Sequence, residues 1–243
     1  MSRYESHFYS NRYEWTARAS ARILDLILPR IPAVKAAVDI GCGVGAWLSV
    51  LQEKGTPDIV GYDGPWVEES MLKIPVSSFV RTDLSQSLKL GRTYDLAISL
   101  EVAEHLPESR APGFVEDLSR ASPFILFSAA IPFQGGYHHV NEQWQSYWVD
   151  LFHQQGYHML DWVRPRIWNE ENIPVWYREN IFLFVSQDRV PDLRPSPDGV
   201  ADVSLPVNIV HPEMYLPKVN PDSVRYGLSL AKRAFKKRWT PSP

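Results

Sequence analysis

The stretch Val38-Asp39-Ile40-Gly41-Cys42-Gly43-Val44-Gly45 decides the fold. The apolar run from Ala36 to Ile40 predicts a short buried strand, and the apolar residues from Ala46 to Gln52 predict a helix. Glycines between them allow a tight backbone bend, and they let a ligand approach where a Cβ would block it. The free N–H groups at the start of the helix suit a carboxylate or a phosphate. The stretch therefore predicts a strand, a ligand-binding turn and a helix.

Further strands and helices alternate along the chain on both sides of this turn. Helical spacing of apolar residues predicts an N-terminal helix over 16–28, stopped by Pro29 and Pro32. Strands are expected at 59–62, 78–81, 94–100, 124–130, 157–163 and 180–186, and helices at 101–106, 114–121 and 144–155. This alternation predicts an α/β fold with a doubly wound, mostly parallel sheet of seven strands.

Length and composition are those of one large globular domain. The chain has 243 residues, of which 44% are hydrophobic, and a formal net charge of −3. That charge argues against a general nucleic-acid binder, which needs a basic surface. One cysteine, Cys42, excludes an intrachain disulfide framework and fits a reducing cytoplasm. The N-terminus lacks the apolar run of a signal peptide, and we expect a cytoplasmic protein.

The composition changes after Gln187. Residues 188–223 are rich in proline, which predicts an irregular extension, so we expect a main domain over 1–187 and an extension over 188–243. Apolar residues from Val224 to Trp239 recur at helical spacing beside six lysines and arginines. This terminal basic helix fits a peripheral membrane or protein contact, and a helix packed on its own domain explains it equally well.

Three acids follow the strand ends around the glycine turn. Asp39 precedes the glycines, Asp63 closes the second strand and Asp83 closes the third. In this pattern residues 36–130 resemble class I S-adenosylmethionine-dependent methyltransferases, whose first motif is an acid followed by Gly-x-Gly-x-Gly. The resemblance places Asp39, Gly41, Gly43 and Gly45 around the methionine part of the cofactor, Asp63 on the ribose, and Asp83 with Leu84 around the adenine. A nicotinamide-binding Rossmann domain uses a similar turn, but the first and third acids have no role in it.

A second motif, Glu101-Val102-Ala103-Glu104-His105, follows the fourth strand. If it is helical, Glu101, Glu104 and His105 share one face and suit a divalent metal such as Mg²⁺, Mn²⁺ or Zn²⁺, with His139, or secondarily His138, completing the shell. The motif is similar to methyltransferases of small-RNA 2′-hydroxyls and of catechol-type ubiquinone precursors, in which a metal holds the acceptor. Alternatively, Glu101 lines the cofactor pocket while Glu104 and His105 cap or orient the loop, or His139 or His105 is a general base. Glu142 is a further candidate catalytic residue.

The polar and aromatic segment from Ile131 to Trp148 is the expected acceptor side. Its string from Gly135 to Trp148 looks like a stretch of bacterial methyltransferases of polysaccharide and secondary-metabolite pathways. The sequence thus predicts methyl transfer to a hydroxyl of a small-molecule or glycan acceptor. The alternatives are N-methylation of an amino sugar or amine, and methylation of an RNA or nucleotide 2′-hydroxyl, with nucleic acid disfavoured by the net charge.

Overall fold

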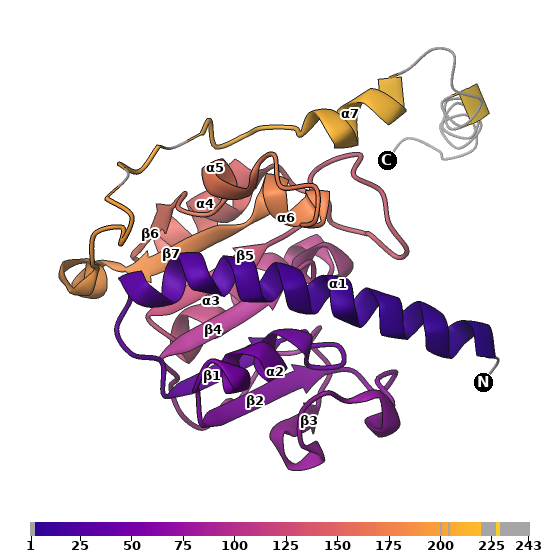
Figure 1. Ribbon diagram of the computed structural model, residues 1–243, viewed down its shortest axis with the longest axis horizontal. Coiled ribbons are helices and arrows are strands. Elements are labelled where there is room, and N and C mark those ends of the chain that lie inside the picture. Colours follow the sequence, from indigo (N-terminus) through magenta and orange to yellow (C-terminus); the bar gives the residue numbers. More distant parts are fainter. Residues whose placement is uncertain (1–2, 200, 204, 220–226, 229–243) are drawn as a thin grey trace. The chain divides into compact units, whose positions relative to one another are not determined.

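The computed structural model describes residues 3–199, 201–203, 205–219 and 227–228, in two units, 1–209 and 210–243. Seven strands form one sheet in the first unit, in the order β3-β2-β1-β4-β5-β7-β6 (Figure 1). The strands are β1 (Ala36–Ile40), β2 (Asp58–Asp63), β3 (Phe79–Arg81), β4 (Leu96–Leu100), β5 (Phe124–Ser128), β6 (Tyr157–Leu160) and β7 (Phe182–Ser186). Strands β1 to β5 pair in parallel, and β7 is antiparallel to both β5 and β6. The predicted mostly parallel, seven-stranded sheet is confirmed.

Helices cover both faces of this sheet. The helices are α1 (Arg3–Ile27), α2 (Ala46–Glu53), α3 (Ala111–Ala121), α4 (Gln145–Gln154), α5 (Arg164–Ile167) and α6 (Val175–Asn180). Helix α1 packs on α2, and Figure 1 shows it running across one face of the sheet. Side chains from α1, α2, α5 and α6 form one buried cluster with that face, while α3 and α4 form a second cluster. Since successive side chains of a strand alternate in direction, each central strand contributes to both cores.

Two expected helices differ from the structure. The helix expected at 16–28 begins earlier, at Arg3. The helix expected over 101–106 is wrong: only Ala103–His105 forms a short 3-10 helix, and Glu101 has a left-handed backbone with φ +55°. The N–H of Glu101 donates to the carbonyl of Ser128 at 3.0 Å, which extends the β4–β5 pairing by one residue. The chain can turn into the helix only after that bond, so Glu101 shares no helical face with Glu104.

After β7 the chain forms a 3-10 helix over Gln187–Asp192 and then an irregular segment that is anchored by hydrogen bonds. Arg164 is fully buried and donates to the carbonyls of Pro206 (3.1 Å) and Val207 (3.0 Å) while pairing with Asp161. The N–H of Leu205 donates to Asp161 as well, at 3.0 Å. These bonds hold residues 205–207 against the main domain.

The second unit contains helix α7 (Pro212–Val219) within its described part. The basic helix expected over 223–239 falls almost entirely outside the described residues. In the part of the chain that is described, no helix combines the length and the apolar character needed to cross a bilayer.

Candidate active site

The glycine turn adopts a backbone that other residues rarely take. Gly41 and Gly45 have φ values of +90° and +83°. A Cβ at Gly41 would lie 2.2 Å from the Cγ2 atom of Val102, so the turn can approach the end of β4 only without a side chain. Gly45 is the N-cap residue of α2, where its conformation directs the chain into the helix.

A cavity of about 840 Å³ opens above this turn, at the carboxyl ends of the central parallel strands. Ligands of open α/β sheets bind at such an edge. Eight of the predicted site residues line the cavity: Asp39, Gly41, Gly43, Asp63, Asp83, Leu84, Glu101 and His105. Gly45, Glu104, His139 and Glu142 lie outside its wall.

Two buried carboxylates, those of Asp39 and Asp63, line the cavity beside the turn. Burial raises the pKa of Asp39 well above its usual range, and the charge of Asp63 raises it further. Burial also raises the pKa of Asp63, although its oxygens accept the N–H groups of Gly43 and Gly64, both at 2.6 Å. Two acids whose charged forms are disfavoured by burial in a pocket suit a positively charged ligand.

Asp83 differs from the other two acids because it lies at the exposed rim. Its carboxylate accepts a hydrogen bond from the N–H of Ser85 at 3.0 Å. The hydroxyl and N–H of Ser85 lower the pKa of Asp83. The third acid is therefore an ionised acceptor at the mouth of the cavity.

Aromatic side chains complete the cavity wall. Trp176 and Tyr177 line it. Sequence reasoning missed Trp47 and Trp66. A Cβ on Gly64 would lie 2.1 Å from the ring of Trp66, which therefore rests directly on that glycine. The Gly64-Pro65-Trp66 string directly after Asp63 is the signal that would have found it.

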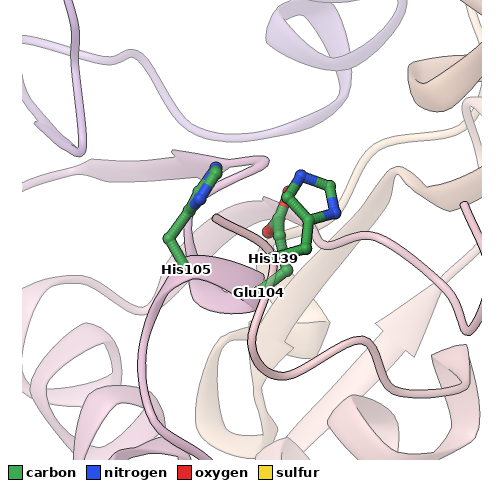
Figure 2. Close-up of side chains that lie close together, drawn as sticks. All are labelled: Glu104, His105 and His139. Atoms are coloured by element: carbon green, nitrogen blue, oxygen red, sulfur yellow. The ribbon is translucent and has the colours of Figure 1, made fainter. Parts of the chain in front are cut away.

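Beside the cavity, Glu104, His105 and His139 come together (Figure 2). Each offers one ligand atom, and these atoms all lie within 4.8 Å of one another. The carbonyl of Glu104 accepts the N–H groups of Val140 (2.9 Å) and Asn141 (3.0 Å). These bonds fix the loop that carries His139 against the 3-10 helix that carries the other two residues.

Both imidazoles of this cluster are oriented through Nδ1. The Nδ1 atom of His139 lies 3.0 Å from Oε1 of Glu142. Glu142 also accepts the N–H groups of Phe133 (2.8 Å) and Gly135 (2.6 Å), so it ties the loop around the imidazole. The Nδ1 atom of His105 lies 3.3 Å from the carbonyl of His138. Nδ1–H donation to these oxygens leaves each Nε2 as the lone-pair nitrogen, the form that binds metals or accepts protons.

Glu104 is a fully buried acid. Within the described chain, neither carboxylate oxygen makes a hydrogen bond of ordinary geometry, although the N–H groups of Glu104 and Ala130 favour its charged form. Burial raises the pKa of Glu104 well above its usual range, and the negative charge of Glu101 adds to this rise. For His105 the pKa is lowered, first by burial and then by His139. A buried acid beside two histidines is a donor set that suits a divalent metal.

Glu101 stands apart from this cluster. It belongs to the cavity wall, and its Oε2 accepts a hydrogen bond from Nε2 of Gln134 at 2.9 Å. Burial raises the pKa of Glu101. The structure thus brings together three of the four predicted metal ligands and places the fourth in the cavity.

Comparison with known proteins agrees with this architecture. The family model of the methyltransferase domain matches residues 12–161. A search of curated proteins found no match. Among solved structures, the chain is similar to DesVI of Streptomyces venezuelae, with 14% identity and a TM-score of 0.55 over 75% of this chain and 96% of that one.

Two other solved structures share this fold. The sugar N-methyltransferase KedS8 from Streptoalloteichus has 15% identity and a TM-score of 0.57 over 75% of this chain and 92% of that one. The methyltransferase domain of bacterial CtHen1-C has 20% identity and a TM-score of 0.51 over 70% and 97%. At these identities the structural likeness shows the fold alone, whereas the family match covers more than half of the chain. The chain therefore belongs to the methyltransferase domain family and is a Rossmann-like, S-adenosylmethionine-dependent methyltransferase.

Proposed function

We propose that this protein transfers a methyl group from S-adenosylmethionine to a hydroxyl group of a small-molecule or carbohydrate acceptor. One observation carries the proposal: His105 lines the cofactor-sized cavity and also belongs to the cluster with Glu104 and His139. A methyl donor bound in the cavity and a methyl acceptor bound at the cluster would therefore meet at His105. Methyl transfer needs this arrangement, because the acceptor must be held in line with the reactive methyl group.

The cofactor would lie along the glycine turn as the family pattern implies. Asp39, Gly41 and Gly43 would surround the methionine part, and the buried acids would favour its positive charges. Asp63 would accept from the ribose hydroxyls, and Asp83 with Leu84 would border the adenine. Gly45 would act indirectly, by starting α2.

The histidines would make the acceptor nucleophilic. An aliphatic hydroxyl ionises poorly at neutral pH, so its proton must leave during the attack. The Nε2 atom of His139 is suited to accept that proton, because Glu142 at Nδ1 would stabilise the resulting imidazolium. Because the pKa of His105 is lowered, its imidazole would be neutral. Its Nε2 atom could then accept a hydrogen bond from the acceptor hydroxyl or take the proton of that hydroxyl.

The cluster also fits a divalent cation. Glu104, His105 and His139 would hold it, since the acid is buried without ordinary hydrogen-bond partners and both imidazoles are oriented through Nδ1. When bound, the cation would lower the pKa of the acceptor hydroxyl. Glu101, which lies outside the cluster, would face the cofactor instead.

An amine is the second candidate acceptor, because the cavity is acidic. Asp39, Asp63, Asp83 and Glu101 line it, and among the described residues no lysine or arginine does. This wall favours a neutral or cationic acceptor over a phosphate-bearing one, which argues against the RNA alternative. An amino sugar would present such an amine, and KedS8 is named as a sugar N-methyltransferase.

The proposal is tested by following labelled methyl transfer from S-adenosylmethionine to matched acceptors. The panel pairs sugars and phenols with their amino counterparts, each assayed with and without a chelator and with added Mn²⁺. We expect transfer to a hydroxyl, and loss of transfer on chelation if the cluster holds a metal. Transfer confined to amines would overturn the hydroxyl assignment, and activity untouched by the chelator would assign the proton transfer to the histidines alone.

A further inference from the structure

Three amide side chains, of which two are buried and that of Gln134 is half-buried, connect Glu101 to the segment that follows β7. Nε2 of Gln134 donates to Oε2 of Glu101 at 2.9 Å, and Nδ2 of Asn180 donates to Oε1 of Gln134 at 2.8 Å. Nε2 of Gln145 in turn donates to Oδ1 of Asn180 at 3.3 Å and to the carbonyl of Ile209 at 2.8 Å. We call Gln134, Asn180 and Gln145 the amide chain.

The carboxylate of Glu101, at one end of the amide chain, determines which way each amide group is oriented. An ionised carboxylate can only accept hydrogen bonds, so Gln134 must present its NH₂ group to Glu101. The oxygen of Gln134 then faces Asn180, whose NH₂ group donates to it, and the same holds one step further at Gln145. Each amide therefore has one orientation that satisfies its neighbours, and an amide with a single orientation holds its partner in place.

Glu101 needs such support. Its left-handed backbone, with φ +55°, is a costly conformation for a residue with a Cβ. Its second oxygen, Oε1, is buried with no hydrogen-bond partner of ordinary geometry in the described chain, while the residue lines the cavity. Burial raises the pKa of Tyr177, and the charges of Glu101 and Asp39 raise it further, so both acids lie near this side chain, which also lines the cavity.

We infer that Gln134 and Asn180 are positioning residues, which hold the Glu101 carboxylate toward the positive sulfonium centre of the bound cofactor. The inference rests on the proposed cofactor site, and it assigns a role that the glycine turn and its acids do not include. It also gives the segment 205–209 a function. Gln145 anchors the far end of the amide chain on Ile209, and buried Arg164 holds the neighbouring carbonyls.

A pair of cofactor analogues separates this role from a general loss of structure. S-adenosylhomocysteine is uncharged at sulfur, whereas sinefungin carries an amine, positive at neutral pH, in place of the sulfonium methyl. The ratio of their dissociation constants, measured by calorimetry, reports how strongly a negatively charged group of the protein favours a positive charge at the position of the sulfonium methyl. A loosened fold would weaken both analogues together and leave the ratio unchanged.

The test is a double-mutant cycle with Glu101→Gln, Gln134→Met and the double variant. We expect each single change to reduce the preference for sinefungin roughly tenfold, as loss of a charged hydrogen bond does, and the double variant to lose no more than either. Gln143→Met is the matched control, because Gln143 pairs with Asn141 in the same loop and lies outside the amide chain. Its preference should equal that of the unaltered protein.

The outcomes separate the two proposals. Binding of neither analogue by the unaltered protein would refute the cofactor site, and the inference with it. Binding with an unchanged ratio in Gln134→Met, while Glu101→Gln loses the preference, would refute the positioning role alone. An unchanged ratio in Glu101→Gln would show that its carboxylate does not face the sulfonium, which overturns the inference and leaves the cofactor site standing.

Discussion

The Oδ2 atom of Asp63 lies 2.6 Å from the backbone nitrogen of Gly43, across 20 residues of sequence. This bond ties the end of β2 to the glycine turn after β1. The other oxygen of Asp63 accepts the N–H of Gly64, so one side chain shapes both turns that border the cavity.

We therefore expect Asp63→Ala to abolish measurable binding of S-adenosylhomocysteine. The change removes the ribose acceptor and leaves the N–H of Gly43 without its partner. Calorimetry checks this, with Asp58→Ala as the control, because Asp58 begins the same strand and pairs with Arg92 at the surface. Unchanged affinity in Asp63→Ala would contradict the assignment of the ribose site.

A second prediction concerns Gly136, whose missing side chain makes room for His139. A Cβ there would lie 2.1 Å from Nε2 and 2.4 Å from Cε1 of the imidazole, so the ring rests on this glycine. Gly136→Ala should push the ring out of the cluster and lower turnover by about 100-fold, the usual cost of a misplaced catalytic group. Binding of S-adenosylhomocysteine should stay the same, since Gly136 lies outside the cavity wall.

The matched control for this change is Gly227→Ala. A Cβ there would meet nothing within 4 Å among the described residues, so the change adds a methyl group without displacing a neighbour. We expect full turnover in the control. Equal activity in both variants would mean that the position of His139 does not matter for the reaction.

The fold was predictable because its signals are local. Glycines at 41, 43 and 45 and the apolar runs around them specify one strand, turn and helix, and the alternation of further runs specifies the parallel sheet. The acids at 39, 63 and 83 were predictable for a related reason. They end adjacent parallel strands, and such ends meet at one edge of a sheet.

The part of the site around Glu101 and the amide chain depends on contacts between residues that are distant in the sequence. The left-handed turn at Glu101 accompanies its hydrogen bond to Ser128 on the neighbouring strand. No local sequence pattern predicts this turn. The contact of Gln134 with Asn180 spans 46 residues and depends on where β7 lies in the sheet. The sequence alone does not reveal the role of a single amide side chain. That role depends on packing, which removes water from the amide and leaves it to hydrogen-bond with its neighbours.

A third prediction concerns His139. His139→Ala should lower methyl transfer by about 10²- to 10⁴-fold, the range for loss of a general base, and leave affinity for S-adenosylhomocysteine within about twofold. His158→Ala serves as the control, because His158 is exposed on β6 at the far edge of the sheet. Single-turnover kinetics with labelled cofactor measures the effect. Full activity in His139→Ala would show that this histidine carries no chemistry.

A fourth prediction concerns the anchoring of the segment after β7 at low pH. Arg30 is buried, stacks on Trp162 and donates to Asp202 at 2.8 Å, and Arg166 donates to the same carboxylate at 3.0 Å. The hydrogen bond from Arg30 lowers the pKa of Asp202 below its ordinary value, and Arg166 contributes as well. Protonation of Asp202 would leave the buried guanidinium of Arg30 without its counter-charge.

The direction of the pH effect on stability follows from the lowered pKa of Asp202. A depressed folded-state pKa gives stability that is complete above the unfolded value of about 3.9 and is lost as the pH falls through the folded value. The protection of peptides covering Arg194 and Leu205, measured as hydrogen exchange relative to the intrinsic rate at each pH, should therefore fall below about pH 4, because their amides bond to Arg30 and Asp161. In Asp202→Asn, the protection of Arg194 relative to the intrinsic exchange rate should already be low at pH 7 and should change little on acidification. A variant that keeps slow exchange at pH 7 would show that the pair with Arg30 does not hold this segment.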